Sequence, residues 1–559
     1  MKIPVGKEDF DEIRRNHDYY VDKTELLYRL AEGTGNEVTL FTRPRRFGKT
    51  LMLSMMESFF SIQKKDSHEV FDGLDIMKHE EFCDKWMNQY PVLNVTLKGI
   101  EALSFEEAYK LLQVKLSDLC KKHTSLLESD AIDADDKEIF RNLKDRKASP
   151  EIVKGSLKTI MRMMAACYGK PVILLIDEYD VPLANASEMD SKENGYYQKM
   201  LDVIRGMFDA ALKTNEYLKF AVVTGCLRIA KESIFTGTNN FMSCSVLDDI
   251  FSEYYGFTQK DVDKILKDAD RTEKAEVIRA WYDGYVFGNT HVYCPWDVTN
   301  YIAALLQKEN ANPKNYWKNT SHNGILLTFV KRTDFDVSDK FEALMNGGTV
   351  LQTISDELTY DTLHESEENL WSVLLMTGYL TKADPEAEGN TVELKIPNEE
   401  IQHIFEETVV RFFKDSLSLD RSKQKELMEA LWKGDEETAS QKMTDILFET
   451  ISYHDYHEDY YHAFLTGIIS GLGYAVKSNQ ENGLGRSDID VREKRRKRGM
   501  LLEAKKSDKE ENMLKDALEG KKQILDKEYL RGFDGFESVV CYGISFFQKK
   551  ALVRKLQFQ

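Results

Sequence analysis

Cysteine is scarce in this sequence, with seven residues among 559, and no two of them form a CxxC pair. Their odd number and scattered positions exclude a regular disulfide framework and give no zinc-ribbon spacing. Proline is also scarce, with ten residues, so long proline-rich linkers are absent. No apolar stretch is long enough to span a bilayer, and charges near the N-terminus do not fit a secretory signal. We therefore expect a cytoplasmic protein with reduced thiols and no membrane partner.

Positive charge is in deficit overall. The chain has 76 lysine and arginine residues against 95 acidic residues, which gives a formal net charge of −19. This balance argues against a uniformly basic nucleic-acid coat but leaves local basic patches open. A length of 559 residues allows roughly three to five domains.

Apolar strand-like segments alternate with helical segments in the first 250 residues. The strand candidates are 38–42, 92–97, 172–176, 218–224 and 243–247, and helical segments between them include 51–62, 104–120 and 151–167. This alternation predicts an α/β fold with a parallel sheet and helices on both faces.

Two further regions follow. Helical patterns dominate from about residue 251 to 350, and residues 369–398 read as helix, strand, turn, strand and helix start, which suggests a winged-helix-like module. Residues 457–545 read as helix, two or three strands, helix and strand, an α/β unit of their own. We predict domains at 1–250, 251–440 and 441–559.

A phosphate-binding loop is predicted after the first strand. Gly48-Lys49-Thr50 stands between a strand and a helix, the context of a P-loop. Backbone N–H groups and the helix N-terminus would surround phosphate, Lys49 would reach the β- and γ-phosphates, and Thr50 would bind Mg²⁺. Arg43 occupies the position of the usual first glycine, so the tripeptide alone also fits an ordinary helix start. The predicted ATP contacts in this loop are Arg45, Arg46, Phe47, Gly48, Lys49 and Thr50.

Acidic and polar residues follow two later strands. Asp177 and Glu178 end the apolar run 172–176, as in a Walker B motif, where Asp177 would hold Mg²⁺ and Glu178 would act as general base. Thr224 could sense the γ-phosphate, and Arg228 could stabilise transition-state charge, within one subunit or across an oligomer interface. A structural role is equally open for each of these last two residues.

The motifs together resemble one bacterial family. Five segments carry the resemblance to the AAA-ATPase-like family: 20–24, 43–50, 177–180, 224–229 and 235–240. In that family an arginine stands where the first P-loop glycine would be. The resemblance covers about residues 1–290 and implies an additional-strand P-loop core related to the STAND and AAA+ groups. It also implies a C-terminal nuclease-like domain.

A second constellation lies near the C-terminus. Glu503 and Lys505 are two residues apart in a predicted strand and so share one face, which Asp488 of a neighbouring strand can join. Two carboxylates offer hard oxygen ligands to Mg²⁺ or Mn²⁺, and the lysine can orient water or stabilise charge on phosphate. This pattern and its surroundings resemble PD-(D/E)XK nucleases. A solvated pair of strands is the alternative interpretation.

Further residues fit the same nuclease pattern. Gln523 lies on the next helix, where related nucleases carry Gln or Lys, Glu458 on the first helix could add a carboxylate, and Asp490 is an alternative ligand. The histidines 454, 457 and 462 lack a zinc-binding order, so we read them as surface helix residues. Residues 492–531 hold fourteen basic and nine acidic residues, which fits either a phosphate-backbone contact or a solvated hairpin.

Two functions from different classes remain open. The first is an ATP-binding and ATP-hydrolysing protein whose ATP state controls a metal-dependent nuclease acting on DNA or RNA. The second is a STAND-like nucleotide switch that binds a protein or nucleic-acid partner, with the nuclease-like domain used only for binding. A role in defence or in a mobile element is compatible with both.

Overall fold

The computed structural model describes most of the chain. The described residues are 1–33, 35–189, 195–228, 241–317, 338–355, 358, 360, 366–387, 389–417, 421–450, 458–482, 485–493, 496–526, 529–533 and 535–556. The chain forms two compact units, the first comprising Met1–Ser321 with Leu351–Glu400 and the second His322–Val350 with Ile401–Gln559. The division into three domains at 250 and 440 stays a prediction. No helix within these ranges is long and apolar enough to cross a membrane.

A five-stranded parallel sheet organises the first unit. Its strands, in the order β2-β3-β4-β1-β5, are β2 (Val92–Thr96), β3 (Val172–Asp177), β4 (Leu218–Gly225), β1 (Val38–Thr42) and β5 (Phe241–Cys244). Every residue of β1 and β3 is buried, as expected for strands covered on both faces. The parallel α/β sheet predicted from the sequence is confirmed.

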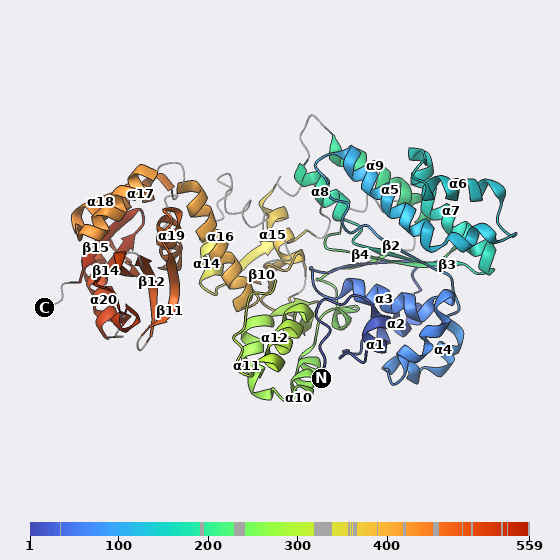
Figure 1. Ribbon diagram of the computed structural model, residues 1–559, viewed down its shortest axis with the longest axis horizontal. Helices are drawn as coiled ribbons and strands as arrows, with labels where there is room; N and C mark the ends of the chain where they lie inside the picture. The colour runs from blue at the N-terminus through green and yellow to red at the C-terminus, as the bar shows by residue number, and fades with distance from the viewer. Residues whose placement is uncertain are drawn as a thin grey trace. The chain divides into compact units, whose positions relative to one another are not determined.

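Helices cover both faces of this sheet (Figure 1). On one face lie α1 (Phe10–Arg15), α2 (Glu25–Gly33), α3 (Lys49–Phe60) and α4 (Glu80–Trp86), and on the other α5 (Phe105–Lys122), α6 (Ala134–Lys144), α7 (Pro150–Tyr168), α8 (Val181–Met189) and α9 (Tyr196–Leu212). Helix α7 shows how the sequence sets such bounds. The Ser149 side chain accepts the Ile152 N–H, Pro150 opens the first turn, and Gly169 at φ +67° ends the helix.

The strand order determines where functional side chains can meet. β4 pairs with both β3 and β1, so the carboxyl ends of these three strands lie side by side. In parallel α/β sheets, ligands bind at this edge. The residues that follow β1, β3 and β4 are the P-loop, Glu178 and the segment after Gly225.

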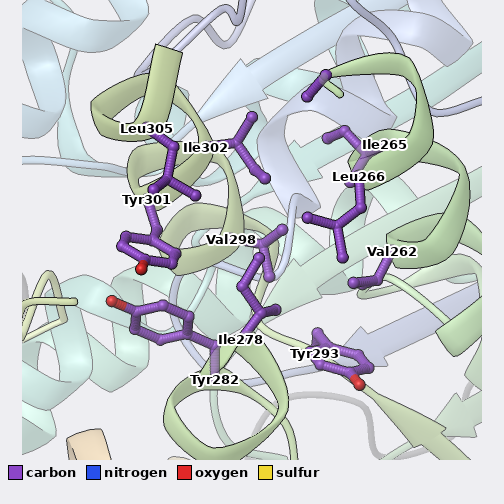
Figure 2. Close-up of a cluster of buried hydrophobic side chains, with 11 residues drawn as sticks. Val262, Ile265, Leu266, Ile278, Tyr282, Tyr293, Val298, Tyr301, Ile302 and Leu305 are labelled. Atoms are coloured by element: carbon purple, nitrogen blue, oxygen red, sulfur yellow. The ribbon is translucent and has the colours of Figure 1, made fainter. Parts of the chain in front are cut away.

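A helical segment follows the sheet. It contains α10 (Gln259–Asp268), which begins with a capping box between Thr258 and Asp261, then α11 (Ala275–Tyr282), the hairpin β6 (Tyr285–Phe287) and β7 (Thr290–Val292), and α12 (Pro295–Gln307). Side chains from α10, α11 and α12, together with Tyr293, form one buried cluster (Figure 2). The sequence predicted only helices here, because strands of three residues are too short to show a period of two.

The segment before residue 400 contains the predicted helix and two strands in the predicted order, together with a strand, β8 (Val350–Thr353), that the sequence did not predict. β8, α15 (Glu367–Met376), β9 (Thr381–Lys382) and β10 (Thr391–Lys395) form a small sheet in the order β8-β10-β9 with one helix. The turn after α15 contains Gly378 at φ +87°, where a Cβ atom would lie 3.0 Å from the Cβ of Pro44. This segment therefore packs directly on the P-loop.

The second unit contains a mixed five-stranded sheet. The strands β11 (Val476–Asn482), β12 (Gly485–Glu493), β13 (Arg498–Lys506), β14 (Ser538–Phe547) and β15 (Lys550–Lys555) lie in chain order, with β13 and β14 parallel and the other pairs antiparallel. Its helices are α14 (Ser338–Met345), α16 (Glu399–Leu417, which starts in the first unit), α17 (Arg421–Lys433), α18 (Glu436–Thr450), α19 (Glu458–Gly471) and α20 (Met513–Asp526). The sequence did not predict β15.

Close packing of α20 on β14 gives a test of this unit. A Cβ atom at Gly543 would lie 1.9 Å from the backbone oxygen of Ala517, and neither backbone can yield cheaply. Gly543→Ala should lower the free energy of unfolding by at least about 1–3 kcal/mol, the usual cost of overpacking. Gly155→Ala in α7 is the control, because the added Cβ meets nothing within 4 Å. This substitution should raise the free energy of unfolding by about 0.5–1 kcal/mol, since alanine favours the helix more than glycine does. Equal effects in chemical denaturation would contradict this packing.

Candidate functional site

The P-loop folds around its own lysine. Gly48 takes a left-handed φ of +82° directly before α3, a conformation that favours glycine. The ammonium group of Lys49 donates hydrogen bonds to the carbonyl oxygens of Arg43 and Pro44, both at 2.8 Å, and is 7% exposed. The helix N-terminus and the lysine therefore lie where phosphate oxygens would bind.

Asp177, at the end of β3, contacts a residue that follows β1 and a residue near the end of β4. The Thr50 hydroxyl donates to its Oδ2 at 2.8 Å, and the Thr224 hydroxyl donates to its Oδ1 at 2.6 Å. The carboxylate is 3% exposed. The Asp177 carboxylate and the Thr50 hydroxyl supply hard oxygen atoms of the kind that Mg²⁺ prefers, so these two residues fit the ion. No group of three His, Cys, Asp or Glu residues suited to a metal occurs in the described part of the chain.

Glu178 has an unusual backbone and environment. Its φ is +52°, which is uncommon for a residue other than glycine and often marks a functional position. Burial raises the pKa of this carboxyl, and the negative charge of Asp177 raises it further. A raised pKa makes the ionised form a better proton acceptor, which suits a general base.

The arginines of the loop point to different partners. Arg43 is fully buried and donates to the carbonyl oxygens of Thr42 at 2.9 Å and Cys244 at 2.8 Å. Its guanidinium lies 5.4 and 5.2 Å from the ring centres of Tyr255 and Phe287. Arg43 therefore joins the ends of β1 and β5, and its buried guanidinium serves the fold.

Three other loop residues that were predicted to contact ATP have side chains close to residues of other segments. Arg46 adopts φ +72° and places its guanidinium 4.2 Å from the ring centre of Trp296. Phe47 is 1% exposed and packs its ring on Tyr285 and Phe287. Arg45 lies in electrostatic range of Cys226, Tyr360 and Asp180.

The segment after β4 is tied to the segment after β3. The Tyr179 N–H donates to the carbonyl oxygen of Thr224 at 3.1 Å, and the Tyr179 hydroxyl donates to that of Leu227 at 2.8 Å. Asp180 Oδ2 accepts the N–H groups of Cys226 at 2.9 Å and Leu227 at 3.0 Å. The sequence motif contained both Tyr179 and Asp180, but their role depends on contacts about 45 residues away.

Thr224, Arg228 and the motif at 235–240 are the remaining residues that the sequence placed at this site. Thr224 is fully buried at Asp177, and Arg228 is half-buried three residues beyond β4. The motif at 235–240 lies outside the described residues.

A buried acid pair lies behind the P-loop. Asp297 on α12 is fully buried, and Glu400 at the start of α16 accepts the Trp317 N–H at 2.8 Å. Burial raises the pKa of Glu400, and the charge of Asp297 raises it further. The thiol of Cys294, three residues before Asp297, is 3.8 Å from the carbonyl oxygen of Arg46, which links this region to the P-loop.

The nuclease-like residues gather on β12 and β13. Ile489 pairs with Leu502, which places Asp488 opposite Glu503. Asp488 Oδ2 accepts the Ala504 N–H at 2.8 Å, and Lys505 Nζ is 3.8 Å from Glu503 Oε1. Glu503 is fully buried, whereas Lys505 is half-buried. The two carboxylates fit a divalent cation by their oxygen chemistry.

Residues around these carboxylates correct and extend the sequence interpretation. His462 is not a plain surface residue, because its Nε2–H donates to the carbonyl oxygen of Asp488 at 2.8 Å. Asp490 forms an ion pair with Arg492 at 3.0 Å. Gln523 Nε2 donates to the hydroxyl of Tyr529 at 3.4 Å, and Tyr529 was missed because no motif includes it.

Tyr529 and Glu458 are two further residues of this domain. Burial raises the pKa of the Tyr529 hydroxyl, and so do the charges of Glu503 and Asp488. Glu458 is the first residue of α19, but its side chain, like His454 and His457, lies outside the description.

Comparison with known families agrees with these two constellations. Residues 4–235 match the family described as "Predicted AAA-ATPase", and residues 456–555 match the PD-(D/E)XK nuclease superfamily. The fold and sites thus define a protein with a P-loop domain and a nuclease-like domain. More particularly, the chain joins an AAA-ATPase-like domain to a PD-(D/E)XK nuclease-superfamily domain.

One curated relative matches along most of the chain. It is "Uncharacterized protein in vnfD 5'region" from Azotobacter chroococcum mcd 1, which is 25% identical over 506 residues. The match covers 88% of this chain and 87% of the relative. Similarity therefore extends into the region between the two matched domains.

The acid pair predicts a pH-dependent stability difference. Glu400 keeps its proton in the folded protein at pH values where the unfolded chain has lost it. The stability that the protonated carboxyl contributes is therefore complete below the unfolded pKa and is lost as the pH rises toward the folded pKa. Glu400→Gln removes this dependence. The free energy of unfolding of the variant minus that of wild type should increase by up to about 1.4 kcal/mol for each pH unit from pH 6 to pH 8. Thermal unfolding across that range measures the difference, with exposed Glu399→Gln as control. Parallel pH profiles for Glu400→Gln and wild type would contradict a protonated Glu400.

Proposed function

We propose that this protein hydrolyses ATP at the P-loop domain and cuts DNA or RNA at the nuclease-like domain, with ATP controlling the cut. The convergence of Thr50, Asp177 and Thr224 is the observation that supports ATP binding most strongly. The gathering of Asp488, Glu503 and Lys505 supports the nuclease.

ATP hydrolysis assigns a role to each residue at the strand ends. Lys49 exchanges its two loop carbonyls for β- and γ-phosphate oxygens, and Thr50 and Asp177 hold Mg²⁺. The ion supplies charge neutralisation on the phosphates. Glu178 accepts a proton from the attacking water while the bond from the γ-phosphorus to the bridging oxygen breaks. Thr224 orients that water, and Arg228 stabilises charge on the phosphoryl group.

Nucleic-acid cleavage assigns roles in the same way. Asp488 and Glu503 would hold Mg²⁺ or Mn²⁺, with Glu458 as a further ligand, and a bound ion would supply positive charge to the phosphate. Lys505 orients the attacking water, and Gln523 orients Lys505 or the phosphate from α20. Water adds to phosphorus, one phosphodiester P–O bond breaks, and the leaving oxygen takes up a proton.

ATP hydrolysis is tested by Glu178→Gln. The amide cannot accept the proton, so kcat should fall by at least about a hundredfold, within the range of general-base contributions. ATP binding should persist within about threefold, because Lys49, Thr50 and Asp177 are unchanged. Steady-state phosphate release and equilibrium ATP binding measure the two quantities. Exposed Glu188→Gln on α8 is the matched control. Undiminished hydrolysis in Glu178→Gln would remove this residue from the reaction.

Nuclease activity is tested by Asp488→Asn. Plasmid, single-stranded DNA and RNA are each incubated with Mg²⁺ or Mn²⁺, with ATP, with a non-hydrolysable analogue, or with no nucleotide. Wild type should cut at least one substrate with a rate that depends on nucleotide, and Asp488→Asn should lose at least about tenfold, because a metal ligand has lost its charge. Exposed Asp508→Asn is the control. If wild type cuts none of these substrates, the nucleotide-switch function takes the place of the nuclease.

A further inference from the structure

Asp180 accepts three hydrogen bonds in a buried site. Two come from the N–H groups of Cys226 and Leu227, directly after β4, as described above. The third comes from the hydroxyl of Tyr360, which is 2.9 Å from the same oxygen, Oδ2. Asp180 is 2% exposed, so this carboxylate depends on protein donors for its stabilisation.

Tyr360 lies outside the region that matches the ATPase family, 180 residues from Asp180 in the chain. It is itself buried, and the Ser187 hydroxyl of α8 donates to its carbonyl oxygen at 2.7 Å. Burial raises the pKa of the Tyr360 hydroxyl well above its ordinary value, and the charge of Asp180 adds to this, so the hydroxyl keeps its proton and remains a donor.

The contact bears on the ATP site through the backbone. Cys226 and Leu227 follow Thr224 by two and three residues, and Thr224 contacts Asp177. Because Asp180 holds the N–H groups of Cys226 and Leu227, the loss of one of its donors would loosen the segment that continues β4 directly after Thr224. The hydrogen bond from the Tyr360 hydroxyl to the Asp180 carboxylate is charge-assisted. Such a bond is stronger than a hydrogen bond between two neutral groups, so it fixes the carboxylate more firmly.

We propose that Tyr360 is a positioning residue of the ATP site, acting through Asp180 to hold Thr224 against Asp177. The inference rests on the proposed ATP hydrolysis for its kinetic consequence, but not for its structural one. It makes a residue of the 351–400 segment part of the nucleotide site.

The test compares Tyr360→Phe with Tyr301→Phe in the full chain. Each substitution removes a hydroxyl that donates to a protein oxygen, but the Tyr301 hydroxyl binds the carbonyl oxygen of Ala311, away from the strand ends. Tyr360→Phe should lower kcat for ATP hydrolysis about fivefold to tenfold and leave KM for ATP within about twofold, because orientation and not binding is lost. Tyr301→Phe should leave both constants within about twofold.

A second measurement needs no hydrolysis. In nucleotide-free protein, hydrogen exchange at the N–H groups of Cys226 and Leu227 should become faster in Tyr360→Phe and stay unchanged in Tyr301→Phe. Asp180→Asn should have the same effects as Tyr360→Phe, and the double variant should add less than the sum of both.

The outcomes separate this proposal from the proposed function. Faster exchange with a kcat effect supports both. Faster exchange in a protein that hydrolyses no ATP even as wild type supports the positioning role and refutes the ATPase. Unchanged exchange in Tyr360→Phe overturns the positioning role, whether or not wild type hydrolyses ATP. A rise in KM with unchanged kcat overturns it too.

Discussion

The carboxylate of Asp177 is the interaction on which the first unit's site depends. It receives one hydroxyl from the P-loop helix and one from the end of β4, while it stands itself at the end of β3. Only the order β3-β4-β1 brings these three positions together. Glu178, the next residue, adopts a left-handed backbone conformation directly after the strand.

The P-loop is held from behind by elements far along the chain. Arg43 fixes the end of β1 to β5, Phe47 packs on the hairpin β6–β7, and Pro44 contacts the turn at Gly378. A loop that lacks the usual first glycine thus gains fixed geometry from tertiary contacts instead of local flexibility. The buried acids Asp297 and Glu400 belong to segments of this same region.

Much of the fold could be predicted from sequence, because buried parallel strands leave a clear apolar pattern. β1 was predicted at its observed bounds, and Glu503 and Lys505, predicted to share a strand face, approach each other to 3.8 Å. The hairpin β6–β7 is too short to show a period, and β15 has too few apolar residues in register to be recognised. The roles of Arg43, His462 and Tyr360 could not be predicted, since their partners lie 201, 26 and 180 residues away.

The central claim is that Thr50 and Asp177 form a site for magnesium and ATP together. The most direct measurement is the equilibrium binding of ATP with and without Mg²⁺, in wild type and in Thr50→Val, whose side chain keeps the shape but loses the hydroxyl. Mg²⁺ should tighten ATP binding by at least about tenfold in wild type and by much less in Thr50→Val, because a metal-binding group is lost. Equal enhancement by Mg²⁺ in both proteins would contradict this claim.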